Sequence, residues 1–334
     1  MSKENFKTIC NQEVIINMID LVTLGETMVL FVPVETGPIK YVYQFNKQIG
    51  GAESNVAIGL SRLEVKTGWI SKLGKDGFGD YIESFIRGEG VDVSQVKRDE
   101  QHPTGVFFKE RRELGESRVY YYRKGSAASF ISENDLDENY ISQAKYLHLT
   151  GITPGLSESC CEAVYKAIEI AKKHDLKIIF DPNIRLKVWN NKDKMINILL
   201  DLIKKSDIVL PGLSEAKILI NEDDKDKILD RFLNLGPEIV ILKIGEKGAY
   251  LGTKDKKVLV SGFPVPKIID PIGAGDAFAA GFITGLTKGY ELEESVKLGN
   301  ACGAFALTVK GDVESLPSWD ELKEFVGNSP ELNR

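Results

Sequence analysis

A glycine-rich segment late in the chain has residue types and spacing suited to phosphate chemistry. It reads Asp270-Pro-Ile-Gly-Ala-Gly-Asp276, and an apolar stretch typical of a helix follows it. Without side chains, Gly273 and Gly275 allow backbone N–H groups to turn towards a ligand. The positive end of the following helix adds to the attraction for an anion. The segment therefore predicts a site for a phosphate group that is transferred.

Asp276 is then a candidate general base. A carboxylate beside the bound phosphate would also stand near an incoming hydroxyl group, whose proton it could accept. Such catalysis typically contributes ~10²- to 10⁴-fold in rate, and positioning and charge stabilisation supply the larger share of phosphoryl transfer. The alternative interpretation is an Asp that only caps its helix. No Gly-Lys-Ser/Thr ends a glycine loop, and Phe278 replaces the last glycine of a dinucleotide fingerprint, which disfavours P-loop enzymes and classical dehydrogenases.

The composition of the chain excludes further classes of protein. The chain has 334 residues, 43% hydrophobic residues, a formal net charge of -6 and a pI near 5.4. A duplex nucleic-acid binder needs many cations, so no nucleic-acid partner is expected. The four cysteines show no metal-ligand spacing, and no apolar run reaches the ~18 residues of a membrane helix. We expect a cytoplasmic protein with no membrane partner, in which residues 1–17 form a disordered extension and residues 18–328 form the working domain.

The elements that must position the segment alternate along the chain. Short, nearly continuous apolar runs predict strands buried on both faces, at 19–24, 67–71, 146–149, 177–180, 208–210 and 239–243. Amphipathic stretches predict helices at 54–63, 157–173, 192–205, 224–235, 275–288 and 292–309. This alternation is typical of an α/β protein with a mainly parallel sheet.

Two aromatic regions depart from this rhythm. Residues 35–48 and 103–124 are rich in Tyr, Phe and Val, partly in alternating order, and predict antiparallel strands of a small separate sheet. Strand periodicity would put Tyr121 and Arg123 on one face, and Tyr120 and Tyr122 on the other. A sheet with aromatic residues on both faces predicts a ligand on one side and a second subunit, hence a homodimer, on the other. The alternative is an aromatic edge packed on its own domain.

Two separated signatures give the chain a resemblance to the ribokinase-like (PfkB) carbohydrate kinases, from about residue 21 to 325. The first is Gly50-Gly-Ala-Glu-Ser-Asn-Val-Ala57 with Leu73-Gly-Lys-Asp-Gly-Phe-Gly79, and the second is the 270–276 segment. The resemblance implies a three-layer α/β/α sandwich with a small β-sheet lid, and a kinase that uses ATP and Mg²⁺. It also implies roles for matched residues: Asp276 as base, Gly273, Ala274 and Gly275 as anion hole, Gly51 and Asn55 at the sugar, and Lys243, Gly245, Gly248 and Asn300 at the nucleotide.

The metal-related motif departs from the family pattern. Where relatives often have Asn-x-x-Glu, this chain has Gly212-Leu-Ser-Glu215, so the asparagine is lost. Glu215 would hold Mg²⁺ through water, as this ion usually retains several waters. The resemblance leaves open whether a monovalent cation such as K⁺ binds near Asp270.

Within the family, the sequence is most similar to 2-keto-3-deoxygluconate kinases. The similarity lies in Tyr121-Tyr-Arg-Lys-Gly-Ser-Ala127, His148-Leu-Thr-Gly-Ile152 and Asp181-Pro-Asn-Ile-Arg185. A planar guanidinium can bind a sugar carboxylate through two hydrogen bonds. The expected sugar-acid contacts are Phe107 (a tyrosine in some of these kinases), Tyr121, Arg123, Ile152, Arg185 and Asp312.

Other functions stay open at this point. The acceptor could be 5-keto-2-deoxygluconate, fructose, ribose or a nucleoside, for which the tyrosines at 120–122 could stack a base. The chain could also be a non-catalytic sugar- or nucleotide-binding regulator. A replaced Asp276 or a broken anion loop would favour the regulator, and the sequence has neither.

Overall fold

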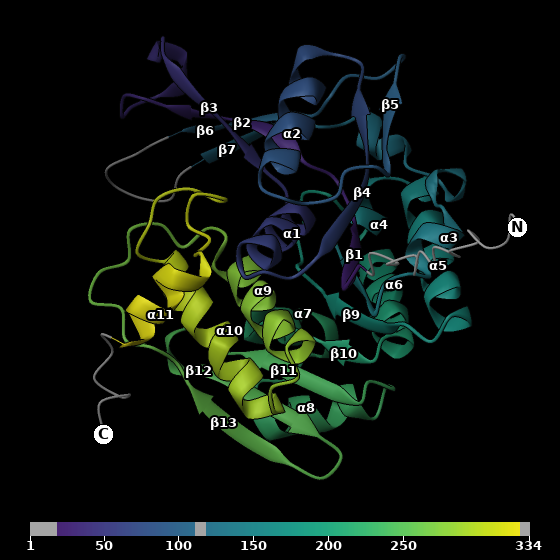
Figure 1. Ribbon diagram of the computed structural model, residues 1–334, viewed down its shortest axis with the longest axis vertical. Helices are drawn as coiled ribbons and strands as arrows, with labels where there is room; N and C mark the ends of the chain where they lie inside the picture. Colours follow the sequence, from purple (N-terminus) through teal and green to yellow (C-terminus); the bar gives the residue numbers. More distant parts are fainter. Residues whose placement is uncertain (1–18, 111–117, 328–334) are drawn as a thin grey trace, which may run out of the picture.

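A nine-stranded sheet forms the centre of the molecule in the computed structural model, which describes residues 19–110 and 118–327 (Figure 1). The strand order is β13-β12-β11-β10-β9-β8-β1-β4-β5. The strands are β1 (Leu21–Leu24), β4 (Thr67–Gly74), β5 (Val96–Asp99), β8 (Tyr146–Thr150), β9 (Lys177–Asp181), β10 (Ile208–Val209), β11 (Ile239–Lys243), β12 (Gly248–Thr253) and β13 (Lys257–Ser261). Neighbours from β5 to β11 are parallel, whereas β12 is antiparallel to both of its neighbours, β11 and β13. The α/β class and the mainly parallel sheet are confirmed.

Helices cover both faces of this sheet. They are α1 (Ala52–Arg62), α2 (Gly77–Gly88), α3 (Glu138–Ile141), α4 (Thr153–Leu156), α5 (Glu158–Lys173), α6 (Lys192–Lys205), α7 (Leu213–Ile220), α8 (Lys225–Leu233), α9 (Ala274–Thr287), α10 (Leu292–Ala306) and α11 (Trp319–Gly327). Short 3₁₀ turns are η1 (Ile39–Tyr41), η2 (Ala127–Phe130), η3 (Glu133–Asp135) and η4 (Gly245–Lys247).

Alternation along the buried strands separates the two helical layers. Ile178 and Phe180 of β9 belong to the core formed with α5, α6, α7 and α8, whereas Ile179 packs on the opposite side with residues of α1, α9 and α10. Successive side chains of a strand point to opposite faces, so an uninterrupted apolar run serves both layers. The three-layer arrangement follows from this pattern.

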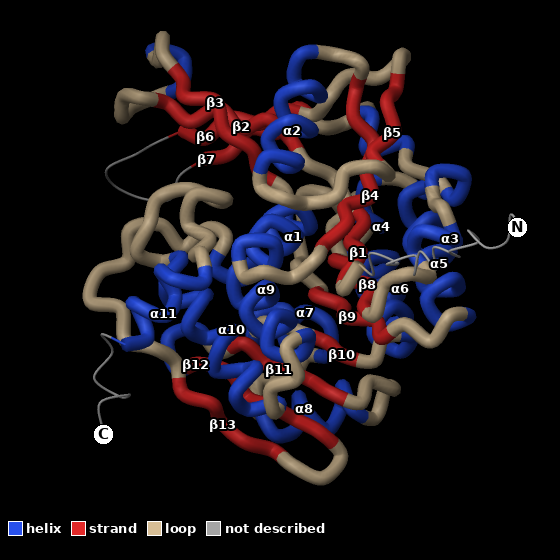
Figure 2. The backbone as a smooth tube through the Cα atoms, in the orientation of Figure 1, coloured by secondary structure: helices blue, strands red, loops and turns tan. Residues whose placement is uncertain are grey.

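A second, four-stranded sheet forms the lid, in the order β3-β2-β6-β7. Its strands are β2 (Met28–Pro33), β3 (Phe45–Gly50), β6 (Val106–Glu110) and β7 (Arg118–Tyr122). Figure 2 shows these strands apart from the large sheet and joined to it through loops. The predicted lid ranges, 35–48 and 103–124, omit β2, which lies just before the first range, and residues 34–44 contain the η1 turn and no strand. The β2–β6 pair is parallel, so the expected antiparallel pairing holds only for the two outer pairs.

The two faces of the lid have different surroundings: one faces a cavity, and the other packs partly on α2, where Phe78 contacts Phe31. Met28, Phe107 and Tyr121 line a cavity beneath it. On the other face, Phe31, Phe45, Phe108 and Tyr122 form a cluster of aromatic rings. Strand alternation therefore separates Tyr121 from Tyr122 as the sequence predicted. The predicted extension at residues 1–17 lies outside the described residues.

Candidate active site

A cavity of about 1030 Å³ lies between the lid and the carboxyl ends of the parallel strands. This is where ligands of open α/β sheets bind. Most of the predicted site residues line it: Gly51, Asn55, Phe107, Tyr121, Arg123, Ile152, Arg185, Glu215, Lys243, Gly273, Gly275, Asp276 and Asp312. Segments far apart in sequence thus meet at one place. Ala274, Gly245, Gly248 and Asn300 are not among the lining residues.

Asp276 lies at the start of α9 and faces the cavity. The helix is preceded by Gly273, whose φ of 81° is in the left-handed region that favours glycine. The Asp276 carboxylate makes no capping bond to its own helix. Its oxygens instead accept hydrogen bonds from Asn55 Nδ2 at 2.8 Å and Asn183 Nδ2 at 3.4 Å. The carboxylate is therefore held by side chains of α1 and the β9 loop, and the helix-cap interpretation does not describe it.

Burial, with a smaller contribution from the nearby carboxylates Asp181 and Asp312, raises the pKa of Asp276 from 3.8 to about 7. The hydrogen bond from Asn55 and the charge of Arg185 act in the opposite direction. A base works best when its pKa lies near the working pH, because it must both accept a proton and be available unprotonated. The environment of Asp276 meets that condition.

Lys243 supplies a positive charge next to the glycine segment. It ends β11 and forms an ion pair with Asp181, at the end of β9, with 2.6 Å between Nζ and Oδ2. Burial alone would lower the pKa of Lys243, but the carboxylates of Asp181, Glu215 and Asp276 outweigh it, so the pKa is raised and the ammonium stays charged. A Cβ placed on Gly275 would have Lys243 Nζ as its nearest neighbour, 3.9 Å away. The space between this ammonium and the start of α9 can therefore admit an anion.

Two further cations of the cavity are paired with carboxylates. Arg123 lies just after β7 and donates through Nε to Glu26 Oε2 at 2.7 Å. Lys109 of β6 donates to Asp312 Oδ1 at 2.8 Å, and both of these side chains are 10% exposed. Arg185 differs, since it is exposed and forms no ion pair within residues 19–110 and 118–327. The two predicted arginines thus have unlike surroundings.

Glu215 has both carboxylate oxygens engaged by backbone amides. Oε2 accepts from Gly212 N at 2.7 Å, and Oε1 accepts from Ile184 N at 2.8 Å. The carboxylate therefore joins the start of α7 to the loop that carries Asn183 and Arg185. Within the described part of the chain, no group of three or more His, Cys, Asp or Glu residues could hold a metal ion.

The predicted residues that do not line the cavity have structural surroundings. Asn300 of α10 donates through Nδ2 to the carbonyls of Val260 and Ser261, which joins this helix to β13. Gly248 has a φ of 100°, and a Cβ there would lie 2.2 Å from Val260 O. Backbone geometry alone is thus sufficient to require glycine at position 248.

Several cavity residues were missed at the level of sequence. Asp181 and Asn183 stand in the segment from which only Arg185 was taken, so that segment did carry a signal. Glu26 and Lys109 also line the cavity. No local pattern marks them, because their partners are 97 and 203 residues away.

A buried carboxylate at a glycine-led helix start, with a buried ammonium nearby, is suited to the transfer of a phosphoryl group to a hydroxyl. The chain belongs to the pfkB family of carbohydrate kinases, whose family model matches residues 18–319. It is a carbohydrate kinase, and the predicted ribokinase-like fold is confirmed. No described helix is long and apolar enough to cross a membrane.

Curated relatives cover nearly the whole chain. A 2-dehydro-3-deoxygluconokinase from Bacillus subtilis is 38% identical over 92% of this chain and 95% of its own length. The enzyme of the same name from Thermoproteus tenax is 36% identical over 92% and 94%. A 5-dehydro-2-deoxygluconokinase from Clostridium botulinum is 33% identical over 93% and 94%.

Solved structures show the same fold. A PfkB protein from Polaromonas sp. superposes with a TM-score of 0.85 at 37% identity, covering 91% of this chain and 99% of that one. A protein from E. coli in complex with ATP and Mg²⁺ gives 0.85 at 29% identity, with 92% and 99% covered. A fructokinase double mutant from Vibrio cholerae with fructose, ADP and potassium ion gives 0.82 at 27%, with 92% and 98% covered.

Proposed function

We propose that this kinase transfers the γ-phosphoryl group of ATP to the primary hydroxyl of 2-keto-3-deoxygluconate, which is the 2-dehydro-3-deoxygluconate of the relatives' names. The product is 2-keto-3-deoxy-6-phosphogluconate. The observation that carries the proposal is that two arginines, Arg123 and Arg185, line the same cavity as Asp276. The names of the two relatives at 38% and 36% identity support the same substrate.

In the proposed reaction, Asp276 accepts the proton of the attacking hydroxyl group. The new bond joins the sugar oxygen to the γ-phosphorus, while the bond from that phosphorus to the bridging oxygen breaks and ADP leaves. Lys243 and the backbone N–H groups at Gly273, Ala274 and Gly275 stabilise the charge on the phosphoryl oxygens. Because the Asp276 carboxylate is fixed by Asn55 and Asn183, it does not have to reorganise when the hydroxyl arrives.

The residues at the phosphate end fit a magnesium ion that arrives with the nucleotide. Mg²⁺ keeps several waters and binds through few carboxylates together with substrate phosphates. Glu215 lines the cavity with its oxygens already accepting amide hydrogen bonds, which suits contact through water better than direct ligation. When bound, the ion would neutralise charge on the phosphate oxygens. A monovalent cation near Asp270 and nucleotide contacts of Gly245, Gly248 and Asn300 remain proposals by resemblance.

The strongest rival substrate is 5-keto-2-deoxygluconate. It is supported by the 5-dehydro-2-deoxygluconokinases at 33% identity, and it also carries a carboxylate. Arginine residues therefore separate sugar acids from neutral sugars such as fructose and ribose, but not one sugar acid from the other. Phe107, which stacks on Tyr121 with ring centroids 5.5 Å apart, has no hydroxyl with which to bind a substrate oxygen.

A substrate panel with coupled detection of ADP tests the assignment. We expect the highest kcat/KM with 2-keto-3-deoxygluconate, a lower value with 5-keto-2-deoxygluconate, and a much lower value with 3-deoxyfructose, in which a hydroxymethyl group replaces the carboxylate. Arg123→Ala should raise the KM of the acid by roughly tenfold, since a charge-assisted hydrogen bond contributes about 1.5–3 kcal/mol. Arg185→Ala should raise it less, because solvent screens the charge of the exposed Arg185. Equal kcat/KM values for the acid and its neutral counterpart would refute a sugar-acid substrate.

The lid also supports a homodimer. Tyr41, Tyr43 and Tyr122 are 62%, 88% and 66% exposed and belong to the lid or its η1 loop. Aromatic residues are enriched at protein–protein interfaces relative to the rest of the protein surface. We therefore place the dimer contact on the outer side of the lid.

A further inference from the structure

One edge of the Arg123 guanidinium is bonded to Glu26. Nε and Nη2 both approach Oε2 of Glu26, at 2.7 and 2.5 Å. The other oxygen of this carboxylate, Oε1, accepts a hydrogen bond from Ser126 Oγ at 2.5 Å. The Glu26 side chain is 1% exposed, yet both it and Arg123 contribute to the lining of the cavity.

The second edge of the guanidinium has donors to spare. A guanidinium carries five N–H groups in a planar fork, and either edge can bind a carboxylate through two hydrogen bonds. Nη1 and the outer N–H of Nη2 have no hydrogen-bond partner among residues 19–110 and 118–327. Glu26 therefore occupies one edge and leaves the other for a ligand.

Glu26 and its partners lie where the chain passes between the large sheet and the lid. Glu26 connects β1 to β2, and Arg123 and Ser126 lie between β7 and η2. The connection from β5 to β6 packs against the connection from β7 to η2. The His102 ring of the first stacks on Phe130, with ring centroids 3.6 Å apart.

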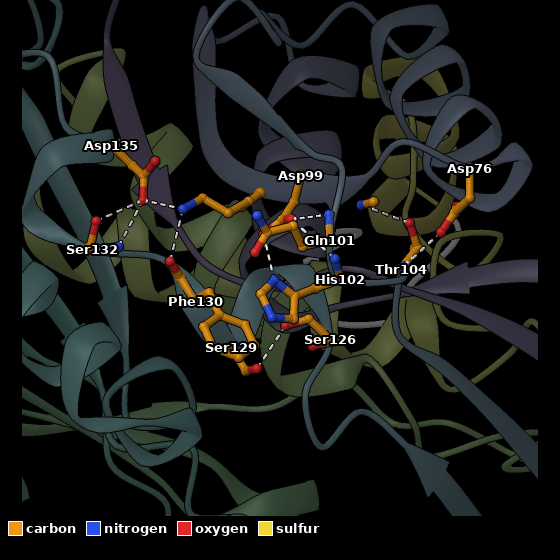
Figure 3. A network of polar contacts seen from close by, with 12 residues as sticks. Asp76, Asp99, Gln101, His102, Thr104, Ser126, Ser129, Phe130, Ser132 and Asp135 are labelled. Atoms are coloured by element: carbon orange, nitrogen blue, oxygen red, sulfur yellow. Dashed lines mark hydrogen bonds and ion pairs between the residues drawn. The ribbon is translucent and has the colours of Figure 1, made fainter.

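Figure 3 shows the neighbouring region around His102, with Ser126, Ser129 and Phe130 beside it. His102 Nδ1 is 2.9 Å from Asp99 Oδ2. A backbone hydrogen bond also joins the β5–β6 and β7–η2 connections, from Ala127 N to Pro103 O at 2.8 Å. Arg123, which the sequence analysis placed in a strand of the lid, therefore follows β7 and is fixed at the base of the lid.

We propose that Glu26 is a positioning residue for sugar-acid recognition, which holds Arg123 so that its second edge faces the carboxylate of the substrate. The proposal rests on the sugar-acid substrate proposed above. If Arg123 left its partner, a fully buried carboxylate would remain unpaired, which is strongly unfavourable. The guanidinium is thus oriented before the substrate arrives, and less conformational freedom is lost on binding.

If Glu26 had the opposite role, as a competitor of the substrate, the opposite change in KM would be expected. If Glu26 competed with the substrate for Arg123, removal of its charge would free the arginine and strengthen binding of the acid. As a positioning residue, its removal weakens binding, because the guanidinium becomes free to turn and the cavity loses a fixed donor pair. The sign of the change in KM therefore separates the two roles.

Glu26→Gln is the decisive variant, because it keeps the shape of the side chain and removes its charge. We expect the KM for 2-keto-3-deoxygluconate to rise roughly tenfold, because the substrate loses a well-placed hydrogen bond from a charged group. The kcat, its pH dependence and the KM for neutral 3-deoxyfructose should stay unchanged. Glu83→Gln is the matched control, since Glu83 pairs with Arg98 at 2.9 Å and neither residue lines the cavity.

Ser126→Ala provides a second, milder variant if Glu26→Gln folds poorly. It removes only the hydroxyl that fixes Glu26 Oε1, and we expect a smaller rise in the same KM with kcat unchanged. An unchanged or lowered KM for the acid, or an equal rise for the acid and 3-deoxyfructose, would overturn the positioning role. Failure of the sugar-acid proposal would give a different result, because the wild-type enzyme itself would then show no preference for the acid. If the wild-type enzyme prefers the acid and Glu26→Gln keeps the same preference, only the role of Glu26 is refuted.

Discussion

Replacement of Asp276 by Asn should make the protein more stable and nearly inactive. Burial raises the pKa of this carboxyl from 3.8 to about 7, so the ionised form is disfavoured in the ligand-free folded state. At 1.36 kcal/mol per pKa unit, ionisation of Asp276 above pH 7 costs the folded protein roughly 4 kcal/mol. Asn has no such cost. Asn55 can also turn its amide, because its Oδ1 is buried, has no hydrogen-bond partner among the described residues, and would accept from the new side chain.

The pH dependence follows from the direction of the shift. A group whose pKa is raised on folding contributes stability that is fully present below its unfolded pKa, near 3.8, and is lost as pH rises through about 7. The stability advantage of Asp276→Asn should therefore grow between pH 4 and pH 7 and then level off. At about 1.4 °C per kcal/mol for a chain of this size, the full effect is roughly 6 °C in Tm.

Thermal unfolding between pH 4 and pH 9 and steady-state kinetics provide the assays. We expect kcat of Asp276→Asn to fall by about 10²- to 10⁴-fold with binding of both substrates retained, and wild-type kcat/KM to rise with pH through about 7. Asp320→Asn is the control, since Asp320 is an exposed residue of α11 that pairs with Lys323. An asparagine variant that keeps its rate, or whose Tm advantage is the same at pH 4 and pH 8, would refute the assignment of Asp276 as a buried base.

Two further predictions concern the lid. Lys109→Met should destabilise the protein by about 3–5 kcal/mol, because it leaves the buried Asp312 carboxylate without its partner. The free energy of unfolding, measured in urea, tests this prediction. A change below about 1 kcal/mol would show that the pair is not sequestered from water. Tyr122→Glu should shift a lid-mediated dimer to monomers in sedimentation experiments. Tyr290→Glu is the control, since Tyr290 is an exposed tyrosine outside the lid. An unchanged mass of the Tyr122→Glu variant would place the dimer contact elsewhere.

Much of the fold could be predicted because most central strands and the long helices carry strong periodic patterns. The predicted strand at 239–243 and the helix at 192–205 have the bounds of β11 and α6. The hairpin of β12 and β13 was missed, since β12 contains two glycines and only alternate residues of β13 are partly buried. In such a strand, at the end of a sheet, the pattern is set by the neighbouring elements more than by local preference.

The candidate site was predictable where function and backbone geometry act on the same short segment. Gly273 and Asp276 are three residues apart, and the helix start brings both to the cavity whatever the rest of the chain does. Lys109 and Asp312 are 203 residues apart and meet only because the lid folds over the C-terminal loop. No local pattern can contain such a pairing.

The contrast between Arg123 and Arg185 shows what this limit means for electrostatics. As letters in the sequence they are equivalent cations, and both were expected to attract a carboxylate. In the folded chain, Arg123 is held by a buried glutamate at the base of the lid, whereas Arg185 is exposed at the cavity and free of ion pairs with the described residues. Solvent and salt screen the charge of Arg185, so it can draw an anion towards the cavity without holding it firmly. Arg123 has little net charge to offer at a distance, but its free edge is fixed and largely shielded from water, which favours directional hydrogen bonds at contact. Attraction and orientation of the substrate carboxylate are thus divided between two residues that the sequence alone could not tell apart.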